Sequence, residues 1–433
     1  MKKLIEKYNN KESLLVISSY PLKGMVYGNG VGGVASFAKN NLIPLSEERK
    51  IVVLAEILTK PEIYEEGNIL VCRIWRRNFP GIYFDLIKAV KKFSKIKHFE
   101  VQFEFSLFGE LIITGFMPLF LGLLKLSGKN IVIVVHQVLL SLDSLSGHLG
   151  WTERTLKQKA FSIILRLYYY LLAINSNKIV VLEPAFKRRL QAIGIKDDKV
   201  SVIRLGVDRN LIATKKEIAM RELGIEKNEF VILVFGFLAW YKGSDLIAEA
   251  FTKLIQKYPS KKIKLILAGG ESLTQKQKPH YQKYVKNLYS LAAKNSRITI
   301  TGFVPEQKLK KYFGAADLVV LPYRAFMSSS AVLSLTLSFG KPLIISEELK
   351  GWFEGMEEEK NLPEFLFFKA NVNSLALALE KIIFNRTNLN ILGNFSYKLA
   401  YERDYQIVGK QYSNLWQTKE GIQKITYEKV ITN

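Results

Sequence analysis

Continuous apolar runs of strand length recur along this chain and alternate with longer segments in which apolar residues return at helical spacing. Runs without polar alternation are typical of strands that are buried on both faces, as in a parallel sheet. Alternation of such strands with helices predicts an α/β fold with helices on both faces of each sheet. The expected strands are 14–19, 51–55, 69–75, 99–103, 130–135, 178–182, 200–203, 230–235, 263–267, 298–301, 318–321, 342–345 and 365–368.

These strands fall into two groups with a polar connection between them. A chain of 433 residues is longer than one hydrophobic core usually supports, so about two domains are expected. The stretch 208–227 has a helical pattern without a strong apolar face, which suits an interdomain connection. We therefore predict two Rossmann-like, doubly wound domains at 1–215 and 225–390, followed by a C-terminal helix within 395–433.

Three consecutive serines mark a candidate anion site. Ser328, Ser329 and Ser330 follow the expected strand 318–321 and stand where a helix should begin. The first N–H groups of a helix lack partners within it, so they can face a phosphate, and serine hydroxyls can supplement them. For an isolated run of serines, plain helix capping is the alternative interpretation.

A second segment favours the phosphate interpretation. One expected strand runs into Gly236, and after a short loop Lys242 and Gly243 precede the next helix. A lysine at a strand-to-helix turn is a point charge suited to pyrophosphate. A neighbouring strand ends in Gly269 and Gly270, which would let a ligand approach the backbone closely. The carboxyl ends of parallel strands are also where open sheets bind ligands.

The first domain offers further candidates. Gly32 and Gly33, in GNGVGGVASF, open an expected helix, and their missing side chains leave room for a phosphate or an acceptor. Loop flexibility is the alternative role for these glycines. His136 ends the apolar run NIVIVVH, which places it at the mouth of a cleft. A solvated loop histidine is the alternative at that position.

Taken in order, these motifs resemble the retaining nucleotide-sugar glycosyltransferases of family 4, which have the GT-B fold of two Rossmann-like domains facing across a cleft. The resemblance rests on Gly32-Gly33, the strand ending in His136, IVVLEPAFKRRLQAIGI, VSVIRLGVD, Gly236 with Lys242-Gly243, Gly269-Gly270, Gly302-Phe303-Val304, and FGKP at 339–342. Each motif is weak alone, but together they extend over most of the chain. The closing passage FSYKLAYERDYQIVGKQYSNLW resembles the last helix of that family, which crosses back to the N-terminal domain.

The resemblance implies a hexosyltransferase that moves a hexose from a nucleotide-diphosphate sugar to a glycan or a lipid-linked acceptor, with retention of configuration. The donor is a substrate, and no cofactor is expected. Lys242, His136 and Glu104 are the expected catalytic residues. In the resembled family Lys242 would neutralise the pyrophosphate, His136 would contact the sugar, and Glu104 would orient the acceptor or the histidine.

The same resemblance assigns the rest of the donor site. Ser328 to Ser330 would bind the diphosphate through backbone N–H groups. Phe303 and Val304 lie where the family's loop meets the base, often through main-chain atoms. The glycines at 32, 33, 236, 243, 269 and 270 complete the expected donor site.

The chain also departs from the family pattern. The usual pair of glutamates falls on Met327 and Leu335, and the usual arginine ahead of the lysine falls on Phe237. A variant branch has similar loops, here LPYRAFMSSSAVL and GFLAWYKG, and Arg324 is expected to supply the missing positive charge. A catalytically weakened nucleotide-sugar-binding subunit stays open as an alternative, as does a GT-B sugar-nucleotide epimerase or soluble-acceptor synthase.

Charge and composition bear on the partners. The formal net charge of +24 points to phosphate-bearing partners, or to a lysine-rich proteome. No arginine-rich block or RNA-binding aromatic signature supports a nucleic acid, so an anionic membrane surface fits better. The absence of Asp-x-Asp and of Cys/His clusters predicts no obligatory metal. With Cys72 as the single cysteine and no targeting segment visible, we expect a cytoplasmic protein, either free or peripheral on the inner face of the membrane.

Two segments raise the question of membrane contact directly. The stretch 107–124 is about long enough to span a bilayer, but Glu110, three glycines and a proline interrupt it, so we expect a core or interfacial helix. The stretch 155–173 interleaves lysine and arginine with bulky apolar residues. That pattern suits a helix lying on a bilayer or one buried against a neighbouring helix.

Overall fold

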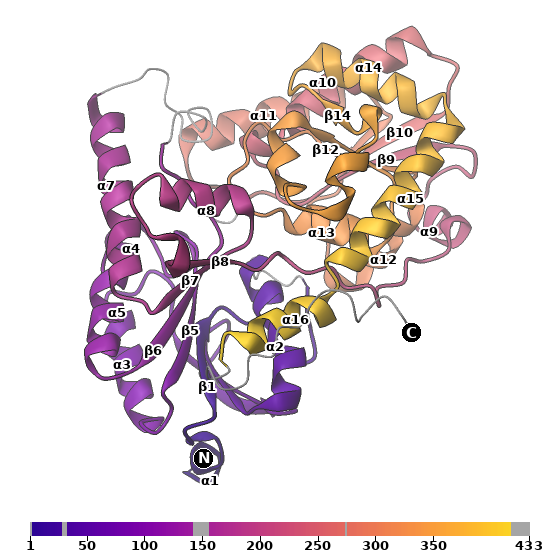
Figure 1. Ribbon diagram of the computed structural model, residues 1–433. Coiled ribbons are helices and arrows are strands. Elements are labelled where there is room, and N and C mark those ends of the chain that lie inside the picture. The colour runs from indigo at the N-terminus through magenta and orange to yellow at the C-terminus, as the bar shows by residue number, and fades with distance from the viewer. Residues whose placement is uncertain (1, 28–32, 142–155, 273–274, 417–433) are drawn as a thin grey trace.

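The computed structural model describes residues 2–27, 33–141, 156–272 and 275–416, and it has two α/β domains, each built on its own sheet (Figure 1). Each strand predicted from the apolar runs is present, with ends shifted by no more than about two residues. The α/β prediction of two Rossmann-like domains is therefore confirmed.

The first sheet has eight strands in the order β3-β4-β2-β1-β5-β6-β7-β8. All neighbours are parallel except β3, which runs antiparallel to β4. The sequence pattern missed β3, because EIYEE is a half-exposed edge strand without an apolar run. Its strands are β1 (Leu14–Ser18), β2 (Ile51–Glu56), β3 (Glu62–Glu66), β4 (Ile69–Trp75), β5 (His98–Phe103), β6 (Asn130–Val135), β7 (Lys178–Val181) and β8 (Val200–Val202).

The second sheet has six parallel strands in the order β11-β10-β9-β12-β13-β14. Its central strands are largely buried because helices cover both faces, which explains their mostly apolar sequences. Its strands are β9 (Phe230–Phe235), β10 (Ile263–Ala268), β11 (Ile298–Ile300), β12 (Leu318–Leu321), β13 (Leu343–Ser346) and β14 (Phe367–Phe368).

The helices pack around these sheets. One face of the first sheet is covered mainly by α3, α5, α7 and α8. The other face is covered by α2 and α16, and Val408 and Tyr412 of α16 join the core on that side. The α-helices are α1 (Lys2–Tyr8), α2 (Gly33–Glu48), α3 (Ile82–Lys92), α4 (Leu111–Gly115), α5 (Met117–Leu126), α7 (Leu156–Ile174), α8 (Pro184–Gln191), α9 (Lys216–Glu222), α10 (Ser244–Lys257), α11 (Pro279–Ala293), α12 (Glu306–Ala315), α13 (Ala331–Ser338), α14 (Val372–Ile383), α15 (Arg386–Glu402) and α16 (Tyr405–Asn414).

Two chain segments cross side by side between the domains. The linker after β8 meets the turn between α15 and α16: the N–H of Val207 donates to the carbonyl of Arg403 at 2.6 Å, and the N–H of Tyr405 donates to the carbonyl of Val207 at 3.2 Å. Beyond this crossing, α16 packs on α2 of the first domain (Figure 1). In the polar stretch 208–227, α9 contributes Ala219 and Met220 to the second core.

The apolar stretch 107–124 is divided between α4 and α5, both short. Within the described ranges, no helix combines the length and the apolar character that crossing a membrane requires.

Candidate functional site

A pocket lies between the two domains, at the carboxyl ends of strands of the second sheet. The first domain contributes residues at the start of α2, the second domain contributes the loops after its strands, and Tyr405 comes from the crossing segment. The lining residues are Tyr27, Gly33, Ser36, Phe37, Leu205, Phe235, Gly236, Phe237, Lys242, Ala268, Gly269, Gly270, Phe303, Val304, Leu309, Ala331, Val332, Ser334, Leu335 and Tyr405. The pocket thus brings together seven residues predicted for the site from far-apart parts of the sequence.

Lys242 provides the positive charge of this pocket. A short 3₁₀ turn, η3 (Trp240–Lys242), carries it, and left-handed Gly243 (φ 70°) leads from that turn into α10. None of the described residues accepts a hydrogen bond from its ammonium group, which lines the pocket. Burial lowers the pKa of Lys242 to about 8. A desolvated cation of this kind gains most from an anion placed beside it.

The glycines at the strand ends keep the backbone open around this ammonium. Gly236 has φ 107°, and a Cβ atom there would lie 2.8 Å from Nζ of Lys242. A Cβ at Gly269 would lie 1.8 Å from the carbonyl oxygen of Gly236, so only glycine fits between the two loops. A side chain at either position would therefore displace the lysine or the loop beneath it.

The serine turn opens α13, as predicted, but two of its hydroxyls bind the protein. Ser330 caps the helix by accepting from the N–H of Leu333 at 3.2 Å. Ser329 donates to Oε1 of Glu183, in the first domain, at 2.5 Å. The groups left for an anion are backbone amides of the first turn, because the first N–H groups of a helix have no acceptor within it. Ala331 and Val332 of that turn line the pocket.

A second helix N-terminus faces the first across the pocket. Gly33 begins α2, and a Cβ atom there would lie 3.5 Å from Cβ of Ala331. Two helix N-termini and one ammonium group therefore converge on one space, which favours negative charge there. Gly32, the other predicted glycine, lies outside the described residues.

The other end of the pocket is aromatic. The rings of Phe237 and Phe303 stack with centroids 6.5 Å apart and an interplanar angle of 29°. Phe303 is 46% exposed, so one face of its ring is available to a ligand. Val304 lines the pocket beside it, and Gly270 lies directly below the backbone of Phe303. Phe237 therefore puts an apolar ring where the resembled family has an arginine.

His136 lies behind the pocket wall. Only 6% of it is exposed, and its ring meets Phe37 edge-on with centroids 4.6 Å apart. Nε2 lies 2.7 Å from Oε1 of Gln102, which in turn donates to Glu100 at 2.6 Å. Burial lowers the pKa of His136 to about 3, so the ring is neutral. Phe37, which contacts the ring, lines the pocket, whereas His136 is not among the lining residues.

Glu104 and Arg324 are not among the residues that line the pocket. Burial raises the pKa of Glu104, and the charge of Arg77 opposes that rise. Arg324 forms a two-point ion pair with Asp245, at 2.8 and 2.6 Å, and donates to the carbonyl of Trp240 at 2.7 Å. Its guanidinium therefore braces the turn that carries Lys242, instead of replacing the family's missing phosphate contact.

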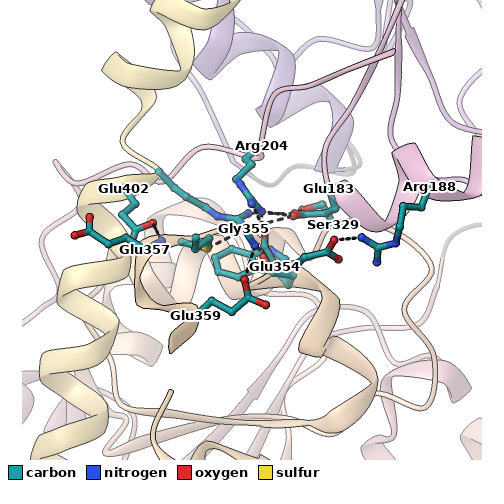
Figure 2. Close-up of polar contacts among 12 residues, drawn as sticks. Glu183, Arg188, Arg204, Ser329, Glu354, Gly355, Glu357, Glu359 and Glu402 are labelled. Carbon is teal, nitrogen blue, oxygen red and sulfur yellow. Dashed lines mark hydrogen bonds and ion pairs between the residues drawn. The ribbon is translucent and has the colours of Figure 1, made fainter. Parts of the chain in front are cut away.

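A buried ionic cluster joins the domains next to the serine turn (Figure 2). Glu183, at the start of α8, receives two hydrogen bonds from Arg403 at 3.1 and 3.2 Å and one from Arg204 at 3.2 Å. The side chains of Glu183 and Arg403 are both 0% exposed. With Ser329 as a fourth member, this Glu183 cluster connects the first domain, the interdomain crossing and the candidate phosphate loop.

Sequence reasoning did not identify the Glu183 cluster or several lining residues. Glu183 stands inside the motif IVVLEPAFK, and its charge directly after a buried strand is the signal that could have drawn attention to it. Tyr27, Phe37 and Tyr405 have no comparable signal, because aromatic residues are common in ordinary cores. Among the described residues, His, Cys, Asp and Glu side chains nowhere gather in threes suitable for a metal ion.

The lowered pKa of Lys242 predicts a pH dependence of anion binding. The protonated amine binds the anion, and because its free-state pKa is about 8, it loses its charge as the pH rises through that value. We expect the Kd for a nucleoside diphosphate to be flat below pH 7 and to rise by up to tenfold per pH unit above about 8. Calorimetric titrations from pH 6.5 to 9.5 measure this, and Lys242→Ala should abolish the slope. A slope that persists in that variant would assign the titration to another group.

Comparison with known proteins places these features in context. Residues 229–385, essentially the second domain, match the family model described as glycosyl transferases group 1. An uncharacterised glycosyltransferase of Methanocaldococcus jannaschii is 25% identical over 257 residues, covering 57% of this chain and 61% of the relative. The mannosylfructose-phosphate synthase of Agrobacterium fabrum is 29% identical over 140 residues, covering 31% and 30% of the two chains. The matched segments thus span less than two thirds of these curated relatives.

Solved structures extend the likeness to nearly the whole chain. The sucrose-phosphate synthase of Thermosynechococcus elongatus superposes with a TM-score of 0.70 at 15% identity, covering 94% of this chain and 98% of that one. Anabaena HepE, in complex with UDP-glucose, gives a TM-score of 0.67 at 15% identity, covering 93% and 98%. At such identities the likeness shows the fold, which is GT-B.

Proposed function

We propose that this protein is a glycosyltransferase that moves a hexose from a nucleoside-diphosphate sugar to a glycan or a lipid-linked acceptor, with retention of configuration. The observation that carries the proposal is the ammonium of half-buried Lys242, which lines a pocket between two Rossmann-like domains together with the first residues of two helices. The match of the second domain to glycosyl transferases group 1 supports the same class of reaction.

The pocket suits departure of a diphosphate. As the bond between the sugar C1 and the phosphate oxygen breaks, negative charge grows on the leaving group beside Lys242 and the first amides of α13. The described lining residues include neither Asp nor Glu, which favours a leaving phosphate oxygen as the group that takes the acceptor's proton. Attack and departure on one face of the sugar retain the configuration, and the protein positions both reactants.

Uridine diphosphate sugars are the first donors to test. Anabaena HepE has been solved with UDP and with UDP-glucose, and this chain shares its fold. The stacked rings of Phe237 and Phe303 offer an apolar surface for a base. The role proposed for Phe303 and Val304 is thus contact with the nucleotide. Gly236, Gly269 and Gly270 leave room for its diphosphate.

A panel of nucleotides and nucleotide sugars tests this proposal. A ligand present at 100 times its Kd should add about 2.7 kcal/mol to the free energy of unfolding, which raises the melting temperature measurably. We expect UDP and one or more UDP-sugars to stabilise the chain, and UMP and inorganic phosphate to do so much less. The proposal fails if no nucleoside diphosphate among the uridine, guanosine, adenosine and thymidine series shifts the melting temperature.

A soluble-acceptor synthase is the second candidate, because named relatives are sugar-phosphate synthases and D-inositol 3-phosphate glycosyltransferases. Product formed from a UDP-sugar and a soluble sugar or polyol phosphate, without added lipid or glycan, would favour it. A third candidate is a catalytically weakened subunit that binds nucleotide sugars. Leu335 supports it, because this leucine lines the pocket at the position of a glutamate in the resembled family. Tight nucleotide binding without transfer to any acceptor would favour that reading.

A further inference from the structure

An unpartnered apolar face lies on the outer side of the first domain, where α4, α5 and α7 lie together (Figure 1). We call it the outer apolar face. Its side chains are unusually open to water, with Ile112 at 78% exposure and Leu126 at 87%. The face consists of Leu111, Ile112, Phe116, Leu119, Leu123, Leu126, Ile163, Ile164, Leu167, Tyr170 and Ile174.

The spacing of these residues forms stripes along the helices. Phe116, Leu119, Leu123 and Leu126 recur at three- and four-residue intervals, and therefore share one face of the α5 region. The opposite side of α5 is also apolar and is buried in the first core. Packing in the core thus explains the apolar residues on the inner side of α5 only, and a continuous exposed apolar patch is typical of an interaction surface.

The helices that carry the stripes are held together as one platform. Nζ of Lys125 donates to the carbonyl of Ile174 at 2.6 Å, and the hydroxyl of Tyr168 donates to the carbonyl of Thr114 at 2.8 Å. The first contact therefore ties the C-terminal end of α5 to the end of α7, and the second ties α4 to α7. The outer apolar face is a preformed surface on three helices, α4, α5 and α7, which contact one another.

Positive charges outnumber negative ones around this face, where the exposed Glu110 stands at the N-cap of α4. The described stretches 111–141 and 156–182 contain no aspartate or glutamate, and they contain Lys125, Lys159 and Arg166, all exposed. The neighbouring helix α3 adds exposed lysines at 88, 91 and 92. Apolar side chains surrounded by basic ones complement an anionic lipid surface, which offers acyl chains and negative headgroups together. A second copy of the chain would instead bring two basic rims against each other.

The inner side of α7 reaches the candidate site. Leu165 packs with Ala325, in a small cluster that includes Leu139 and Met327. Met327 directly precedes the serine turn, so α7 alone separates the outer apolar face from the loop before the proposed phosphate site. A surface bound to this face would lie close to the interdomain pocket.

We propose that the outer apolar face docks on an anionic lipid bilayer, with the stripes of α5 and α7 entering the headgroup region and the lysines of α3, α5 and α7 facing the phosphates. The docking itself does not depend on the enzyme's substrate. Its consequence does rest on the proposed function: a docked enzyme would receive a membrane-borne, lipid-linked acceptor at the pocket.

Sedimentation of the full chain with vesicles tests the docking. We expect binding to vesicles of phosphatidylcholine with 30 mol% phosphatidylglycerol and weak binding to pure phosphatidylcholine. Leu119→Glu and Leu167→Glu should each weaken binding about tenfold or more, since each removes an exposed leucine that docking would bury in the bilayer and adds repulsion. Arg166→Gln should weaken binding about fivefold. Leu377→Glu on α14, 66% exposed in the second domain, adds the same charge elsewhere and should have little effect.

Each outcome decides the proposal. Equal losses for Leu167→Glu and Leu377→Glu would mean adsorption driven by net charge alone, and would overturn docking through this face. Concentration-dependent dimerisation without lipid, abolished by Leu167→Glu, would overturn it in favour of a second copy. UDP affinity, measured on the same variants, should stay at the wild-type value, which shows that they fold. A failure of UDP binding in the wild type contradicts the proposed function and leaves the docking result to be judged on its own.

Discussion

Replacing Lys242 with alanine is expected to lower the rate of sugar transfer about 100-fold, the scale of losing one preorganised contact to a developing anion. The ammonium lines a pocket where partial burial already lowers its pKa, and no described residue accepts its hydrogen bonds. The proposed diphosphate would relieve the cost of its desolvation. The same change should weaken binding of the product nucleoside diphosphate, because product and transition state both carry the charge that Lys242 faces.

Lys257→Ala is the matched control for this prediction. Lys257 ends α10, the helix that Lys242 precedes, and forms an ion pair with Glu380 at 2.9 Å on the protein surface. Its loss removes one positive charge from the same domain and should leave transfer unchanged. If Lys242→Ala retains transfer within about threefold of wild type, Lys242 is not the group that stabilises the leaving diphosphate.

Replacing Glu183 with alanine is expected to destabilise the protein by about 3–5 kcal/mol, because it would leave buried arginine charges without their counter-ion. Arg403 is 0% exposed and Arg204 is 18% exposed, and both donate to the Glu183 carboxylate. Burial already lowers the pKa of Arg403 to about 10, and the charge of Glu183 opposes that effect. Urea unfolding followed by circular dichroism measures the loss of stability as a lower urea concentration at the midpoint of the first unfolding transition.

Two further variants serve as controls. One removes the charge of Glu183 but keeps its volume, and the other removes a carboxylate elsewhere on the surface. Glu183→Gln keeps the volume and one acceptor oxygen, so it should lie between wild type and Glu183→Ala. Glu226→Ala removes an exposed carboxylate that pairs with Lys262, and should leave the midpoint unchanged. A Glu183→Ala midpoint equal to that of wild type would show that the cluster contributes no net stability.

The Glu183 cluster also bears on the candidate site. Ser329 is held by a carboxylate of the other domain, 146 residues away in sequence, so the serine turn is positioned partly by the first domain. Glu183→Gln should therefore also weaken nucleotide binding more than a surface change of equal charge. The serine turn then depends on domain contact as well as on its own helix.

Much of the fold was predictable because burial on both faces leaves a direct pattern in the sequence. The runs that became β1, β2, β6 and β9 are mostly apolar, so buried strands of a parallel sheet could be predicted from them. β3 was missed because an edge strand that is half exposed needs no apolar run. Lys242 and its glycines were predictable for a related reason, because a strand-to-helix turn is a local feature.

The sequence by itself determined the two parallel sheets, the turn that carries Lys242 and the helix that begins after the serines, since each depends on neighbours along the chain. Only the tertiary structure decided that Arg324 pairs with Asp245, that Ser329 pairs with Glu183 and that Phe37 contacts the ring of His136. It also decided which apolar side of α5 is buried and which is exposed, because a leucine contributes the same pattern in a core and on a surface. Such choices depend on residues far apart in sequence, which meet only when the chain has folded.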